Sequence, residues 1–128
     1  GGIVIGDSKA GTVTMTNANI TGNNAGTNGG GVYVKIGTFK MDNSAISKNT
    51  ATSNGGGVYV GNGGNVSSVF VPATFTMTNG TIYGTGAGDL ANTAAIGGAA
   101  LFKTAKGVAT LNDTDQGTAE LKIDGNIP

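Results

Sequence analysis

The chain has 128 residues, of which 25 are glycine, and its seven Lys residues balance seven acidic residues to give a formal net charge of zero. A neutral chain without Arg lacks the basic surface that nucleic acids require, so we exclude nucleic acid as a partner. The absence of Cys and His removes disulfides, thiolate and imidazole metal ligands and the commonest general base, and we therefore expect neither a metal nor another cofactor.

No stretch of the sequence approaches the roughly 18 to 20 consecutive apolar residues that cross a bilayer, so we expect no membrane insertion. The first residues, Gly1–Ile5, have neither the basic nor the apolar region of a signal peptide. They instead match Gly30–Val34, in the middle of the repeat described next. We therefore expect a piece of a longer protein whose export signal lies elsewhere.

Two different motifs recur with a common period of 26 residues. The segment Gly11–Met15 returns in similar form as Gly37–Met41, and Gly29–Val34 returns letter for letter as Gly55–Val60. A fixed period of this size is typical of repeat architectures, in which each unit buries its apolar face by stacking on its neighbours. The repeat therefore predicts a column of stacked units.

Each repeat contains three short segments in which apolar and polar residues alternate, as in β-strands. In chain order, the first surrounds Val13 and Met15, the second surrounds Ile20, and the third contains Val32 and Val34. Corners rich in Asn and Gly separate them. We predict an all-β fold, a parallel β-helix of about four coils with three strands each.

The predicted coils form one domain that spans residues 1–128. Complete coils are expected at about 11–36, 37–72 and 73–106, with partial turns at 1–10 and 107–128. Residues that recur at one position of the coil should stack in files inside the column. The predicted interior files are Met15, Met41 and Met77, and Ile20, Ile46 and Ile82.

Asparagines recur at the corners in two further files. Asn17, Asn43 and Asn79 each follow a file methionine by two residues, which by alternation points them inward. We interpret them as a structural ladder of hydrogen-bonded amides. Asn23 and Asn49 form a shorter file of the same kind.

Two insertions interrupt the period and are expected to leave the core as loops, which in repeat proteins often carry binding residues. About ten extra residues lie around Gly61–Ala73 and include Phe70, and about six lie around Asp89–Ala94. Across the second insertion, the expected alignment makes Ala87 the counterpart of Ala25 and Ala51. It also makes Gly97 the counterpart of Gly29 and Gly55.

An outward stripe of apolar residues is predicted on the third strand of each coil. Tyr33 and Tyr59 lie between inward valines, and the alignment places Val4 and Leu101 on either side of them. Such a stripe can bind a partner, or it can serve only cross-strand packing. The candidate binding residues are therefore Tyr33, Tyr59 and Leu101, together with Phe70 in the loop.

The segment Ile46–Ala51, followed by Gly55–Tyr59, resembles the paired FxxN and GGA(I/L/V) repeats of the chlamydial polymorphic outer membrane proteins and of related spirochaete surface proteins. The likeness extends from Gly1 to about Phe102. The resemblance implies that the β-helix is right-handed. It also implies an exported passenger or stalk region at the bacterial cell surface, used for adhesion or display.

The leading hypothesis is therefore a non-enzymatic, extracellular segment that binds a protein or glycan on a host or neighbouring cell. Two alternatives stay open. Open ends of the β-helix could stack end to end into an extracellular filament, or the chain could bind or cleave polysaccharide. Cleavage would use Asp113, Asp115 and Glu120, near Asp124, as acid and base, although a solvated turn accounts for the same residues.

Overall fold

The computed structural model describes residues 1–112, and this part of the chain consists of β-strands with one short 3-10 helix. The elements in chain order are β1 (Ile3–Ile5), β2 (Gly11–Thr16), β3 (Asn19–Thr21), β4 (Asn24–Ala25), β5 (Val32–Val34), β6 (Gly37–Ser47), β7 (Thr50–Ala51), β8 (Val58–Val60), β9 (Gly64–Val66), β10 (Val69–Val71), β11 (Ala73–Ile82), the 3-10 helix η1 (Thr85–Leu90), β12 (Thr93–Ala94), β13 (Leu101–Lys103) and β14 (Val108–Asn112).

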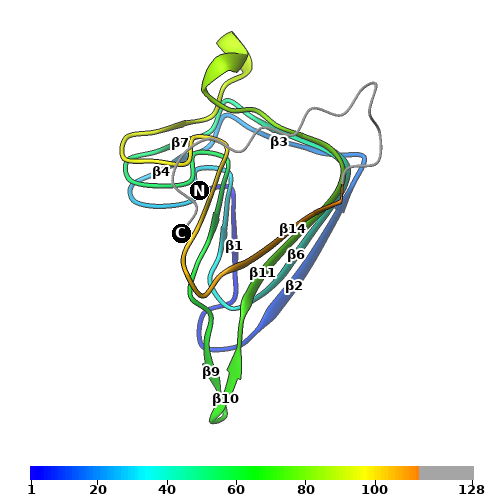
Figure 1. The fold of residues 1–128 in the computed structure, drawn as a ribbon, viewed down its shortest axis with the longest axis vertical. Helices are drawn as coiled ribbons and strands as arrows, with labels where there is room; N and C mark the ends of the chain where they lie inside the picture. Colours follow the sequence, from blue (N-terminus) through cyan, green and yellow to red (C-terminus); the bar gives the residue numbers. More distant parts are fainter. Residues whose placement is uncertain (113–128) are drawn as a thin grey trace.

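Three parallel sheets share most of these strands, and the chain visits them in rotation. They have the orders β1-β5-β8-β13, β14-β11-β6-β2 with β3 also paired to β6, and β12-β7-β4. From β2 the chain runs through β3, β4 and β5 and then returns beside β2 as β6; we call this circuit a pass. Successive passes overlie one another around a triangular outline, with β1, β2 and β3 on its three sides (Figure 1).

The strand register confirms the 26-residue repeat and the predicted interior files. Tyr33 pairs in parallel with Tyr59, as the repeated motif requires. The file residues are no more than 8% exposed, so they face the interior as predicted. Their pairs are Met15 with Met41, Met41 with Met77, Ile20 with Ile46, and Ile46 with Ile82.

One continuous core joins all passes because residues of the three parallel sheets point inward in alternation along most of each strand. Phe39 and Phe75 show how the passes pack on each other. Their rings are stacked, with centroids 5.5 Å apart and an interplanar angle of 17°, and both side chains are fully buried. Each pass thus covers the apolar side chains of the one beside it, which a single pass could not do alone.

Two segments leave the repeating path. Strands β9 and β10 form an antiparallel hairpin at the predicted insertion Gly61–Ala73. Helix η1 forms the second protrusion, and it begins at Thr85, earlier than the predicted insertion around Asp89–Ala94. Figure 1 shows the hairpin and η1 projecting from two different corners of the triangle.

Because the second insertion begins earlier than expected, the predicted alignment beyond it is wrong. Ala94, and not Ala87, pairs with Ala51, while Ala87 lies within η1. The strands β4, β7 and β12, which carry this alanine file, were not predicted. Each has only two residues, too few to show an alternating pattern.

The expected position of the glycine run is also wrong, by one residue. Gly29 and Gly55 have φ values of 72° and 68°, and Gly98 has the matching value of 66°. Gly98, and not Gly97, is therefore their counterpart. In a strand a slip of one residue exchanges the inner and outer faces, and this slip changes the site described below.

The asparagine file Asn17, Asn43 and Asn79 stacks as predicted but does not point inward. Asn17 and Asn43 are exposed, and all three have left-handed φ values, between 47° and 56°. This conformation turns the chain at the corner and interrupts the alternation of a flat strand. The next residue faces the interior instead: Ser44 is buried, and its Oγ accepts a hydrogen bond from the Ala18 amide over 3.1 Å.

Candidate functional site

The outward stripe lies on the sheet β1-β5-β8-β13, and its last member is Phe102. The register pairs Tyr33 with Val4 on one side and with Tyr59 on the other, and it pairs Tyr59 with Phe102. Leu101 is 0% exposed and belongs to the core, so the prediction of Leu101 as a surface binding residue is wrong. The aromatic stripe consists of Tyr33, Tyr59 and Phe102, all half-buried.

The aromatic rings of the stripe contact one another closely. The ring centroids of Tyr59 and Phe102 are 5.4 Å apart with an interplanar angle of 2°, and Tyr33 contacts Tyr59 edge to face at 4.9 Å. Burial raises the pKa of the Tyr59 hydroxyl, and Tyr33 adds to the rise. A sugar stacks on an open aromatic face, but Tyr59 has a neighbouring ring on both sides. The geometry favours cross-strand packing as the main role of Tyr59.

The hairpin β9–β10 carries apolar side chains that the body of the protein does not cover. Val69 is 64% exposed and Phe70 is 51% exposed. Phe70 pairs with Asn65, and Val69 pairs with Val66. Side chains alternate along each strand, so Phe70 lies on one face of the hairpin and Val69 on the other.

The base of the hairpin adjoins the aromatic stripe at Gly61. A methyl group on Gly61 would lie 3.3 Å from Cε1 of Tyr33 and 3.7 Å from Cε1 of Tyr59. The two rings therefore pack over this glycine, which is itself buried. The stripe and the hairpin form one continuous region at this corner, although the predicted contact residues Tyr33 and Phe70 lie on different elements.

A second file of asparagines runs through the interior beside the sheet β12-β7-β4. Asn49 and Asn92 are fully buried, and each contributes its side-chain oxygen to the pass before it. Asn49 Oδ1 accepts the Asn23 amide over 2.9 Å, and Asn92 Oδ1 accepts the Asn49 amide over the same distance. The structural role predicted for Asn23 and Asn49 is confirmed, and the file includes Asn92, which the sequence did not show.

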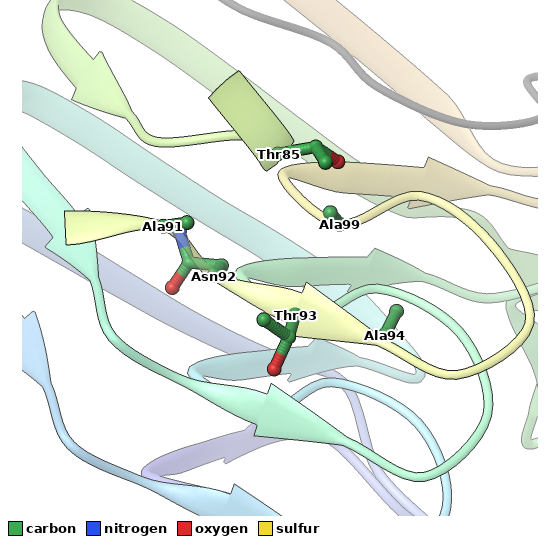
Figure 2. A pocket seen from close by; sticks show the side chains of 6 residues that line it. All are labelled: Thr85, Ala91, Asn92, Thr93, Ala94 and Ala99. Carbon is green, nitrogen blue, oxygen red and sulfur yellow. The ribbon is translucent and has the colours of Figure 1, made fainter. Parts of the chain in front are cut away.

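A shallow pocket of about 150 Å³ lies where η1 meets β12. Figure 2 shows Thr85 at the end of η1, Asn92 and Thr93 along the adjacent strand, and Ala99 on the segment that faces them. The pocket is smaller than the roughly 300 to 1,000 Å³ of most ligand sites. The Asn92 amide already donates to the carbonyls of Ile46 and Tyr83, which leaves this pocket mainly with methyl groups and threonine hydroxyls.

Charged side chains form few contacts in the described part of the chain. Lys35 Nζ lies 2.7 Å from Asp7 Oδ1, and this hydrogen bond and charge lower the pKa of Asp7. Among residues 1–112, no three Asp, Glu, His or Cys side chains are grouped so as to hold a metal ion. The acidic residues proposed for polysaccharide cleavage, Asp113, Asp115, Glu120 and Asp124, lie outside the described residues.

Comparisons with protein families, with curated proteins and with solved structures find no match to this chain. No helix within residues 1–112 is long and apolar enough to cross a membrane. The functional assignment therefore depends on the geometry of the chain itself.

Two residues that matter here, Phe102 and Asn92, were missed at the sequence level. Asn92 lies within the predicted second insertion and Phe102 lies beyond it, where the alignment slipped. The segment Gly98–Lys103 could have corrected it, because aligning Gly98 with Gly55 places Leu101 opposite Val58 and Phe102 opposite Tyr59. Aromatic residues then align with each other, and aliphatic residues do likewise.

Proposed function

We propose that the chain is a right-handed parallel β-helix from an exported bacterial surface protein, and that it is a non-enzymatic scaffold that displays the hairpin β9–β10 for binding. The observation that carries the proposal is the contrast between a regular body and an exposed apolar protrusion. The body repeats one parallel register through four strands of a sheet, whereas the hairpin exposes Val69 and Phe70.

The β-helix interpretation is supported by the rotation of the chain through three parallel sheets and by the triangular outline in Figure 1. Each pass would advance by about 4.8 Å, the spacing of neighbouring strands. Stacked passes form a stiff column, which suits a stalk that holds a contact element away from a cell. The right hand and the surface location follow from the resemblance to bacterial passenger repeats.

The binding role is supported by the way the hairpin interrupts the repeat without disturbing it. Phe39 and Phe75, on either side of the hairpin in the sequence, keep their register. An insertion tolerated in this way is free to vary and to carry contact residues. The expected partner is a protein or a glycan on a host or neighbouring cell, and the exposed valine and phenylalanine favour a protein with an apolar surface.

The test compares the natural chain with a variant that lacks residues 63–72. This deletion leaves Met41 and Met77 26 residues apart, as Met15 and Met41 are, so the body should retain its register. Labelled protein is titrated on epithelial cells, bacterial cells and a glycan array. We expect saturable binding of the natural chain to at least one surface, and at least a tenfold loss in the deletion variant. Equal titration curves would show that the hairpin is not the contact.

A paired substitution, Val69→Ser with Phe70→Ser, is the matched control for the deletion. It keeps the hairpin but removes its exposed apolar side chains, so it separates loss of the side chains from loss of the loop. Binding that the deletion abolishes and the double substitution leaves intact would assign recognition to the backbone of the hairpin.

A further inference from the structure

The hairpin β9–β10 is an incomplete sheet. Within residues 1–112, neither strand pairs with any strand other than its partner in the hairpin. Its two-residue turn places Ser67 and Ser68 at left-handed φ values of 50° and 65°, a conformation that favours Asn and Gly. A two-stranded hairpin is at best marginally stable in water, so an added strand would stabilise this element.

The free edge of β10 lacks the features with which proteins usually prevent strand addition. Exposed edges are commonly protected by Lys, by Pro or by a bulge. The segment 61–73 contains no charged residue, and Pro72 follows β10 instead of interrupting it. The sequence Val69–Val71 consists of β-branched and aromatic residues, which favour strands. The edge of β10 is therefore competent to pair.

The geometry of the turn fixes which groups point outward. In a hairpin with a two-residue turn, the residues that flank the turn form a hydrogen-bonded pair, which here is Val66 with Val69. Pairs alternate along the ladder, so the next pair, Asn65 with Phe70, directs its backbone N–H and C=O groups away from the hairpin. On β10 the outward groups belong to Phe70.

We propose that β10 pairs with β10 of a second copy of this chain, in antiparallel orientation about a two-fold axis at Phe70. Phe70 would lie opposite the partner's Phe70 and exchange two backbone hydrogen bonds with it, and Val69 would lie opposite the partner's Val71. The two hairpins would become one four-stranded antiparallel sheet, with the phenylalanines on one face and the valines on the other.

The occupant is a second copy because the edge is complementary to itself. An isologous contact requires one patch that matches itself under a two-fold rotation, and an uncharged strand with Phe at its centre and Val on both sides satisfies this condition. The formal net charge of zero also removes long-range repulsion between copies. The inference does not rest on the proposed function, since it needs only the hairpin.

Cysteine cross-linking tests the register directly, because the chain has no cysteine of its own. In a hydrogen-bonded antiparallel pair the Cα atoms are about 5.5 Å apart, within the range of a disulfide. We expect Phe70→Cys to form a disulfide-linked dimer on mild oxidation at least ten times faster than Thr14→Cys, an exposed position on β2. Asn65→Cys reports pairing through the opposite edge, and it should cross-link as slowly as Thr14→Cys.

Sedimentation velocity tests the association without cysteine. For the natural chain we expect a dimer fraction that rises with protein concentration. The expected dissociation constant is about 1 mM, that of a weak contact. Phe70→Lys should remain monomeric, because it places two like charges opposite each other, whereas the matched variant Thr16→Lys, at an exposed position of β2 that pairs with Asp42, should behave like the natural chain. A natural chain that stays monomeric throughout, or dimers that persist in Phe70→Lys, as end-to-end stacking would give, would overturn the inference.

Discussion

The two asparagine files of this chain share a residue type and a period, but they stabilise the fold in different ways. The outer file, Asn17, Asn43 and Asn79, lies at a corner, and its members share left-handed φ values. The inner file, Asn23, Asn49 and Asn92, has two fully buried members that are hydrogen-bonded through both ends of the amide. The repeat alone does not distinguish a residue kept for its backbone conformation from one kept for its side-chain bonds.

The contrast is sharpest between Asn49 and Asn43, which belong to the same pass. Asn49 Nδ2 donates to the Ile20 carbonyl over 3.0 Å and to Asn92 Oδ1 over 2.9 Å. Asn43 Nδ2 donates to Asn17 Oδ1 over 2.6 Å, and this hydrogen bond is exposed to solvent. Water can replace the outer bond but cannot reach the inner ones.

Asn49→Ala should have the largest effect. It removes the acceptor of the part-buried bond from the Asn23 backbone amide and the donor of the buried bond to the Ile20 carbonyl, and each buried polar group left without a partner costs about 1 to 3 kcal/mol. We expect the free energy of unfolding to fall by about 3 kcal/mol, measured by urea denaturation. A loss below about 1 kcal/mol would mean that water enters the column and satisfies these groups.

Asn23→Ala should cost less, because Asn23 lies at the end of the inner file and is half-buried. The Asn49 oxygen would lose the Asn23 side chain as a donor but keep the backbone amide of residue 23. We expect a loss of about 1 kcal/mol in the same urea experiment, since one part-buried hydrogen bond to Asn49 and one long, exposed bond to the Thr21 carbonyl are removed. Equal losses for Asn23→Ala and Asn49→Ala would contradict a dependence on burial.

The sequence predicted well those features that depend on period alone. The methionine and isoleucine files, the pairing of Tyr33 with Tyr59 and the position of the first insertion follow from spacing, because stacked repeats place equal positions next to each other. The files were predictable because both insertions leave their spacing within a pass unchanged. The parallel stacking of strands and the interior files could therefore be inferred without any structure, whereas the sheet β12-β7-β4 could not.

Features that depend on local conformation could not be predicted from the period. Helix η1 adds residues to its pass and is kinked at Gly88, whose φ is 61°. Nothing in the alternation of apolar and polar residues shows where such a helix begins. The resulting slip of one residue exchanged Leu101 and Phe102, a core residue and a surface residue. The left-handed turn at Asn43 likewise reversed the expected inward direction, because the parity rule holds only while a strand remains extended.

Asn43→Ala is the direct counterpart of Asn49→Ala, since the same atoms are removed from the outer file. The left-handed conformation at residue 43, with φ of 47°, disfavours Ala by about 1 kcal/mol. We therefore expect the free energy of unfolding to fall by about 1 kcal/mol, well below the loss for Asn49→Ala. If the two substitutions cost the same in urea denaturation, the distinction between the files would be wrong.

Asn43→Gly should have the smallest effect and separates the two possible roles of this residue. Glycine adopts the left-handed conformation without a steric penalty, but it cannot form the exposed bond to Asn17, and it increases the conformational entropy of the unfolded chain. The relief of the steric penalty nearly offsets the lost hydrogen bond and the added entropy of the unfolded chain. We therefore expect a free energy of unfolding within about 0.5 kcal/mol of that of the natural chain. If Asn43→Gly instead lost as much as Asn43→Ala, the amide bond would be what the outer file contributes. Because Gly80 follows Asn79 in the next pass and has its own positive φ of 114°, the corner already accepts a glycine one residue further on.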